Sequence, residues 1–151
     1  MSLSTRNLDG APLVITDALH TYFKVGDVRQ VSVRGLKGAT YVSKVESVRK
    51  SDAEEVIRFA GETDRVYVNT TATTVIEDPS MHRRITIAKE GSNSTVVWNP
   101  WVAKAKAMPD FGDEEWPAMV CVETANALDN AVQVPAHGSH TTTAHLSVER
   151  T

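Results

Sequence analysis

The chain has 151 residues, enough for one domain or for part of a larger one. Its net charge of −3 argues against nucleic acid or an anionic membrane as the main partner. A single cysteine, Cys121, excludes an internal disulfide and fits a reducing, cytoplasmic location. Histidines and cysteines do not stand at zinc-ligand spacing, and no apolar run reaches membrane-spanning length. We therefore expect neither a metal nor a membrane contact.

Short runs of β-branched and aromatic residues, separated by turn residues, dominate the chain and predict strands. In chain order these runs are Leu13–Ile15, Leu19–Phe23, Val28–Val33, Glu55–Phe59, Arg65–Thr70, Thr73–Glu77, Arg84–Ala88, Thr95–Trp98, Met119–Glu123 and Ala131–Val134. One segment, Trp101–Met108, is instead rich in helix formers and is stopped by Pro109. Many short strands at near-regular spacing predict an all-β fold, an antiparallel β-sandwich or barrel.

Turn residues mark the connections between these strands. Gly35 and Gly38 bracket one turn, and Glu77–Ser80 and Lys89–Asn93 form two others. A basic cluster at 82–84 reads as an exposed hairpin turn rather than as a phosphate site. The strand pattern begins almost at the start of the chain, so a sheet cut open here would expose unpaired edges. Two copies could associate through such edges.

Two polar side chains stand in apolar surroundings that favour proton transfer. Glu123 ends the apolar strand that begins at Met119, and His20 lies in the strand Leu19–Phe23. Apolar neighbours raise a carboxyl pKa toward neutrality, and a histidine can give or take a proton near pH 7. Taken alone, the commoner interpretation is a solvent-facing glutamate and a core histidine. Alternation along the strand places His20 and Tyr22 on one face.

Four segments of the sequence carry a resemblance to a known family. They are Ala18–Leu36 (ALHTYFKVGDVRQVSVRGL), Gly61–Thr70 (GETDRVYVNT), Ile85–Trp101 (ITIAKEGSNSTVVWNPW) and Phe111–Asn126 (FGDEEWPAMVCVETAN). In this order they resemble the glucose-6-phosphate 1-epimerases, or hexose-6-phosphate mutarotases, of the aldose 1-epimerase superfamily. The resemblance covers nearly the whole chain.

This resemblance implies a galactose mutarotase-like supersandwich, an antiparallel β-sandwich of roughly twice this length. Residues 1–151 would be a single domain that corresponds to its C-terminal half. The family's second active-site histidine and most of its phosphate-binding basic residues belong to the N-terminal half. Nothing in this sequence matches them.

The resemblance also implies a function, which is the interconversion of α and β anomers of hexose 6-phosphates without a cofactor. Glu123 would be the general base and His20 the general acid, facing each other across a sugar-sized hollow. Asp64 would bind sugar hydroxyls, and Tyr22 and Trp101 would contact the substrate. The partner would be a small sugar phosphate. A truncated, non-catalytic carbohydrate-binding β-sandwich is the alternative.

Other interpretations of these side chains stay open at this point. Asp64 could equally stabilise the turn before the strand Arg65–Thr70. Trp98 is expected to fill the core, whereas Trp101 could stack on a sugar or pack inside. Cys121 alternates with valines and is expected to be a small buried hydrophobe.

Overall fold

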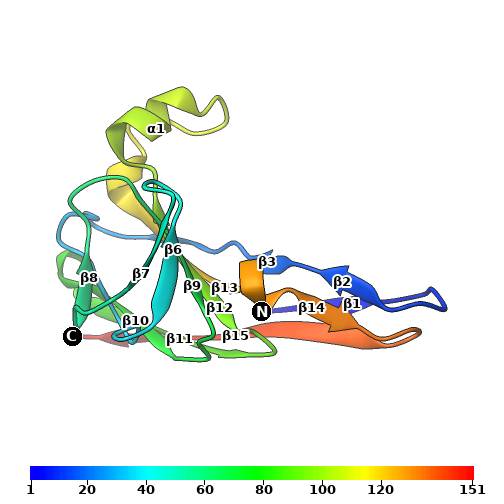
Figure 1. The fold of residues 1–151 in the computed structure, drawn as a ribbon. Helices are drawn as coiled ribbons and strands as arrows, with labels where there is room; N and C mark the ends of the chain where they lie inside the picture. Colours follow the sequence, from blue (N-terminus) through cyan, green and yellow to red (C-terminus); the bar gives the residue numbers. More distant parts are fainter.

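The computed structural model describes residues 1–151 and consists of two antiparallel sheets that face each other (Figure 1). The first sheet has six strands. In spatial order these are β1 (Ser2–Arg6), β15 (Ser139–Arg150), β11 (Arg83–Glu90), β10 (Thr74–Asp78), β5 (Ser32–Arg34) and β8 (Val56–Arg58).

The second sheet has seven strands, all antiparallel to their neighbours. In order these are β3 (Asp17–Leu19), β13 (Met119–Asn126), β12 (Ser94–Asn99), β9 (Thr63–Val68), β6 (Thr40–Ser43) and β7 (Val48–Ser51), and β4 (Tyr22–Lys24) also pairs with β13. A two-stranded ribbon is made of β2 (Leu13–Ile15) and β14 (Val132–Val134).

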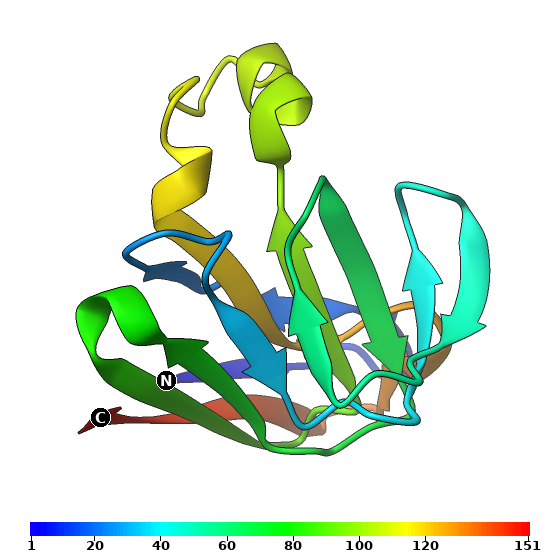
Figure 2. The ribbon, with the colours of Figure 1, turned by 90° about the vertical axis from the view of Figure 1, so that its left-hand side faces the viewer.

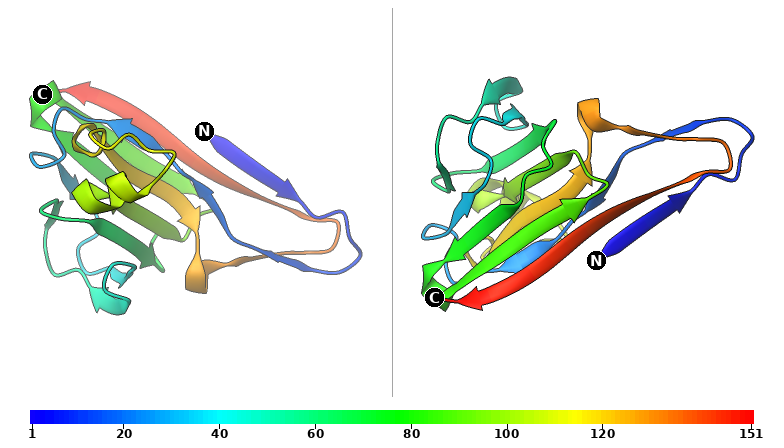
Figure 3. Two further views of the ribbon diagram at one scale, coloured as in Figure 1. Left: turned by 90° about the horizontal axis from the view of Figure 1, so that it is seen from above. Right: turned by 90° about the horizontal axis from the view of Figure 1, so that it is seen from below.

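The helical segments are few and short. They are α1 (Trp101–Ala107) and the 3₁₀ turns η1 (Pro79–Met81), η2 (Trp116–Ala118) and η3 (Leu128–Asn130). Figure 2 shows α1 and η2 together at one end of the sheets, beyond β12 and β13. Figure 3 shows the β2–β14 ribbon projecting to one side of the sheets, together with the N-terminal part of β15, while β15 runs back from there to the C-terminus on the opposite side. No helix has both the length and the apolar character needed to cross a membrane.

Side-chain alternation divides the seven-stranded sheet into two different faces. One face packs Tyr67, Val97 and Val122 against the isoleucines of the six-stranded sheet, among them Ile76 and Ile85, to form the main core. The register of β9, β12 and β13 sends the alternate side chains to the opposite face. The all-β antiparallel sandwich expected from the sequence is therefore confirmed, and its outer face is left to carry other chemistry.

Some element boundaries differ from those expected. The helix ends at Ala107 with Met108 as its C-cap, as expected to within a residue. Val28–Val31 form a turn instead of a strand, with the Val31 N–H donating to the Val28 carbonyl, and the strand begins only at Ser32. The turn forms because Asp27 binds the backbone N–H and the guanidinium of Arg29, a local pairing that competes with strand pairing.

The basic cluster at 82–84 is another correction, since Arg83 and Arg84 lie in β11 and not in a turn. They stand directly opposite Asp78 and Glu77 of β10. The corresponding ion pairs measure 3.4 Å each, Arg83 Nε to Asp78 Oδ2 and Arg84 Nη2 to Glu77 Oε1. Opposite charges facing each other across two strands stabilise the register, so the cluster is structural.

Candidate active site

The sequence predicted one continuous strand for the segment that carries His20, but this segment forms two short strands instead. Both β3 and β4 pair with β13, and the pairs Leu19↔Thr124 and Tyr22↔Cys121 share one register. The ladder is interrupted because the Leu19 carbonyl accepts the backbone N–H of Thr21 at 2.8 Å and its hydroxyl at 3.1 Å. Because the same register continues on both sides of this interruption, His20 lies opposite Glu123, although His20 itself makes no ladder hydrogen bond.

Glu123 lies inside β13 and not at its end, because the strand continues to Asn126. All eight residues of β13 are buried. Val96 of β12 stands directly opposite Glu123, and Cys121 precedes it on the same face. The sequence thus places a carboxylate in the middle of a buried strand, with apolar neighbours along and across the sheet.

The two expected catalytic side chains touch each other. His20 Nδ1 lies 3.4 Å from Glu123 Oε1. The imidazole side chain is 52% exposed, whereas the glutamate side chain is 5% exposed. Burial, and next the negative charge of Asp64, raise the pKa of Glu123 to about 7. The carboxyl group can therefore both release and accept a proton near neutral pH.

An aromatic cluster surrounds the imidazole. Tyr22 stacks on His20 with ring centroids 4.9 Å apart and an angle of 8° between the planes. Trp98 presents its edge to both rings, at 6.0 Å from His20 and 5.9 Å from Tyr22. The stacking confirms that His20 and Tyr22 share a face. Trp98 is buried in a small hydrophobic cluster with Met119 and Cys121, as expected of a core residue, and its ring also forms part of this face, with Phe111 packed against it.

Trp101 lies apart from this cluster. Its ring packs on Trp116 with centroids 4.4 Å apart and contacts the main core between the sheets. The buried amide of Asn99 fixes the end of β12, since it donates to the carbonyls of Trp116 and Met119 at 2.8 and 2.9 Å. This anchor sends Trp98 and Trp101 to different sides. Nothing brings Trp101 to His20, and its substrate contact stays a prediction.

Asp64 belongs to β9, where it stands opposite Trp98 on the outer face. Burial raises the pKa of its carboxyl group, with the positive charge of Lys44 opposing that shift. The carboxylate makes no ion pair and no hydrogen bond with another side chain or with a turn, so the structure does not support a turn-stabilising role. A half-buried acceptor without a partner is free to bind a ligand.

The expected sugar-sized hollow between the acid and the base is not present in this chain. Five cavities occur, and neither His20 nor Glu123 lines any of them. The two side chains contact each other directly, with the imidazole half-exposed and the carboxylate buried. The nearest hollows flank that face: one of about 410 Å³ is lined by Tyr22 and Phe111, and one of about 370 Å³ by Asp64.

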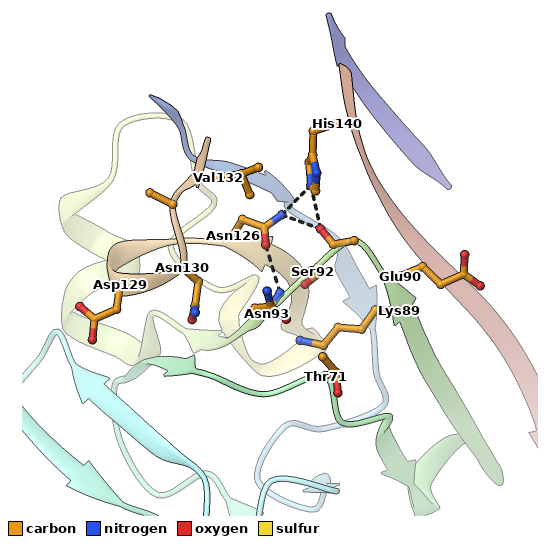
Figure 4. Close-up of a pocket in the computed structure, with 12 residues that line it drawn as sticks. Thr71, Lys89, Glu90, Ser92, Asn93, Asn126, Asp129, Asn130, Val132 and His140 are labelled. Carbon is orange, nitrogen blue, oxygen red and sulfur yellow. Dashed lines mark hydrogen bonds between the residues drawn. The ribbon is translucent and has the colours of Figure 1, made fainter. Parts of the chain in front are cut away.

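The largest cavity, about 590 Å³, lies instead at the far end of β13 (Figure 4). Its lining is mostly polar and includes Asn126, His140 and Lys89. The Asn126 amide donates to Asp17, the Gly91 carbonyl and Thr142 at 2.8–3.0 Å. These hydrogen bonds tie the wall together, and none of the residues expected to act on a sugar lies there.

Cys121 is a neighbour of the acid–base pair that sequence reasoning treated only as a buried apolar residue. It is fully buried, as expected. Its sulfur and the ligand atoms of His20 and Glu123 nevertheless all lie within 4.8 Å of one another. Linear spacing could not reveal this group, because His20 comes from a distant segment that only the sheet register brings back.

Comparison with known proteins agrees with this architecture. Residues 1–147 match the family described as "Aldose 1-epimerase". The chain belongs to the aldose 1-epimerase family. It is 40% identical over 130 residues to a protein of Cenchrus ciliaris, and 39% identical over 126 residues to one of Escherichia coli K12, both named "Putative glucose-6-phosphate 1-epimerase". These alignments cover 83% and 81% of the chain, but only 40% and 42% of the relatives.

Solved structures show the same relation. The crystal structure of a Salmonella typhimurium protein described as a "putative mutarotase" superposes on the chain with a TM-score of 0.88 and 30% identity. The superposition covers 99% of the chain and 50% of that protein. An Escherichia coli protein described as a "Putative aldose 1-epimerase" shares the fold, with a TM-score of 0.74 at 14% identity. The chain thus spans about half, or less, of the relatives that it matches.

Proposed function

We propose that the chain carries the acid–base pair of an enzyme that interconverts the α and β anomers of hexose 6-phosphates. One observation supports this above the others. A buried glutamate with a pKa raised to about 7 contacts an exposed histidine on the outer face of the sheet. Family membership and the names of the curated relatives favour anomer interconversion over the non-catalytic carbohydrate-binding alternative.

The reaction requires one proton to leave the anomeric hydroxyl and another to reach the ring oxygen. Glu123 takes the first proton and His20 supplies the second. The C1–O5 bond then breaks, the aldehyde rotates, and reversal of the transfers closes the ring on the other face. Both oxygens are bonded to the same carbon. A base and an acid that lie side by side, 3.4 Å apart, can therefore serve them together.

Neighbouring groups suit a sugar on this face. The exposed ring of Tyr22 and the edge of Trp98 offer apolar surface to the C–H groups of a pyranose. The unpartnered carboxylate of Asp64 offers two acceptors for hydroxyl groups. The phosphate preference rests on the relatives' names, because the residues of this face include no arginine cluster.

The test is the rate of anomer exchange on glucose 6-phosphate, measured by NMR magnetisation transfer, with free glucose as the comparison substrate. We expect the chain to accelerate exchange and Glu123→Gln to remove the acceleration, by on the order of 10³-fold, because the amide cannot accept the proton. Circular dichroism establishes that the variant keeps its fold. Unaltered exchange in Glu123→Gln would exclude Glu123 as the base.

Absence of acceleration by the unmodified chain would also overturn the proposal for these 151 residues. In that case, binding of glucose 6-phosphate detected by saturation-transfer NMR would support the carbohydrate-binding alternative. If the chain accelerates anomer exchange of free glucose as much as that of glucose 6-phosphate, the proposed reaction stands and the proposed phosphate preference is wrong.

A further inference from the structure

Three ligand types meet at the acid–base pair. A ring nitrogen of His20, the sulfur of Cys121 and a carboxylate oxygen of Glu123 lie within 4.8 Å of one another. Cys121 and Glu123 project from β13 on the same face, and His20 comes from the break between β3 and β4. Imidazole, thiolate and carboxylate are the three side-chain groups that bind Zn²⁺ in proteins.

The distances require only a small adjustment to surround an ion. Zinc bond lengths of about 2.0–2.3 Å put the ligand atoms of a tetrahedral site roughly 3.3–3.7 Å apart. His20 Nδ1 and Glu123 Oε1 already lie 3.4 Å apart, and the sulfur lies within 4.8 Å of the other two ligand atoms, so it has to approach them by at most roughly 1.5 Å. His20 makes no ladder hydrogen bond and can move, and its exposed edge leaves a fourth position to water.

Charge also favours a cation here. Asp64 and Glu123 place two carboxylates on this face; the positive charges of Lys44 and Lys104 act on Asp64, but neither lysine forms an ion pair with Asp64 or Glu123. Cys121 is a free cysteine, so its sulfur is not committed to a disulfide. A thiophilic cation displaces the thiol proton and forms the thiolate bond.

We propose that His20, Cys121 and Glu123 form a binding site for a thiophilic divalent cation of the zinc type. The bound ion occupies the same nitrogen and carboxylate that the acid–base pair uses. It therefore inhibits the chain's exchange activity, and this consequence rests on the function proposed above. The site makes the ion an inhibitor and not a cofactor.

The probe for binding is Co²⁺, whose thiolate complexes show a sulfur-to-metal charge-transfer absorption. We expect the band to develop on titration of the chain and to disappear when Zn²⁺ is added. Cys121 is the only cysteine, so the band reports this site alone. Cys121→Ser should abolish the band, and His20→Asn should weaken Co²⁺ binding by on the order of 10²-fold.

His145→Asn is the matched control, because His145 pairs with Glu90 at 3.2 Å on the exposed surface, without a thiol. It should leave the band unchanged. The proposal is overturned if Co²⁺ gives no band, or if the band persists in Cys121→Ser. Since Cys121 is buried, circular dichroism and Cys121→Ala accompany that variant, while the half-exposed His20 provides an independent substitution.

The inhibition is measured separately. Zn²⁺ should slow anomer exchange, a chelator should restore it, and Cys121→Ser should need at least about 10-fold more Zn²⁺ for half-inhibition. Exchange that continues at a Zn²⁺ concentration saturating the Co²⁺ site would overturn the inhibitory role. A chain that shows the band but no exchange at all would refute the proposed function and leave the metal site standing.

Discussion

Glu123 and Asn126 lie on the same buried strand, but their surroundings satisfy them to very different degrees. Asn126, on the inner face, donates to Asp17, Gly91 and Thr142, and its oxygen accepts the backbone N–H of Asn93. Glu123, on the outer face, has a single polar contact, the imidazole of His20. With His140 Nε2 at 3.3 Å as a fifth partner, the buried amide of Asn126 is a structural element, whereas a buried carboxylate with one partner is chemically available.

The comparison separates the largest hollow from the candidate active site. The cavity of about 590 Å³ is lined by Asn126 and belongs to the satisfied end of β13. The candidate acid–base pair lies elsewhere: Glu123 is in the middle of the same strand, on the outer face, and neither it nor His20 lines a cavity. Hydrogen-bond satisfaction and cavity size therefore indicate different parts of β13, and the variants proposed here test which of the two marks the active site.

The largest expected effect concerns Asn126, at the end of β13 where the buried polar groups have hydrogen-bond partners. Asn126→Ala should lower the free energy of unfolding by about 4 kcal/mol, because it leaves several buried donors and acceptors without partners. Urea denaturation provides the measurement. Asp129→Asn is the control in the same cavity. Its carboxylate pairs with Arg49 at half-exposed positions and should contribute less than about 1 kcal/mol. Equal losses of unfolding free energy in the two variants would show that the hydrogen bonds of Asn126 stabilise the fold no more than an exposed ion pair does.

The next effect concerns Glu123 and has the opposite sign. Its pKa is about 7 in the folded chain and near 4.3 when unfolded, so the unfolded state loses its proton first as pH rises. Glu123 therefore costs stability above pH 4.3, and the loss is complete near pH 7. As the pH rises from 4 to 8, the free energy of unfolding of Glu123→Gln should therefore increase by on the order of 3 kcal/mol relative to that of the unmodified chain.

Glu77 provides the control for this pH dependence. Burial raises the pKa of its carboxyl, but the hydrogen bonds from Arg34 and Ser32 outweigh burial and lower the pKa overall. Its contribution to stability is therefore present above pH 4.3 and is lost in more acidic solution. Glu77→Gln should destabilise the chain at pH 8 and lose that effect toward pH 3. The same pH trend in both variants would contradict the assigned burial of Glu123.

The sequence predicted the sandwich because its core strands have a clear apolar alternation. β9, β11 and β12 all came from such runs. The sequence did not reveal β7, whose four residues are all exposed, or β15, whose C-terminal half is exposed throughout. These strands are defined by pairing with a neighbour, β15 with β11 and β1, and not by a pattern of their own.

The candidate site was predictable in its residue types but not in its geometry. The apolar run before Glu123 allowed a carboxylate with a raised pKa, but taken alone it favoured a solvent-facing glutamate; the resemblance reversed that preference, and the carboxylate is buried with its pKa raised to about 7. The direct contact with His20 depends on a register shared by two strands, which no local pattern encodes. Trp98 lies in β12 and Trp101 begins α1, so their different placement follows from where the strand ends, which the sequence did not distinguish in advance.

A third prediction concerns the partner of Glu123. His20→Asn should lower the rate of anomer exchange by on the order of 10²-fold, because the amide cannot protonate the ring oxygen. NMR exchange on glucose 6-phosphate measures this rate. His145→Asn removes an imidazole that pairs with Glu90 on the exposed surface, and should leave the rate unchanged. Equal losses in the two variants would mean that histidine replacement acts through stability.

The smallest effect concerns the ring that orients the imidazole. Tyr22 stacks on His20, and a pair of stacked rings contributes about 0.5–1.5 kcal/mol beyond burial. Tyr22→Leu should therefore slow exchange by roughly 2- to 12-fold. Tyr22→Phe keeps the stack and removes only a hydroxyl that bonds to nothing in the chain, so it should recover most of the rate. Equal losses in both variants would shift the role of Tyr22 from holding His20 to binding the sugar through its hydroxyl.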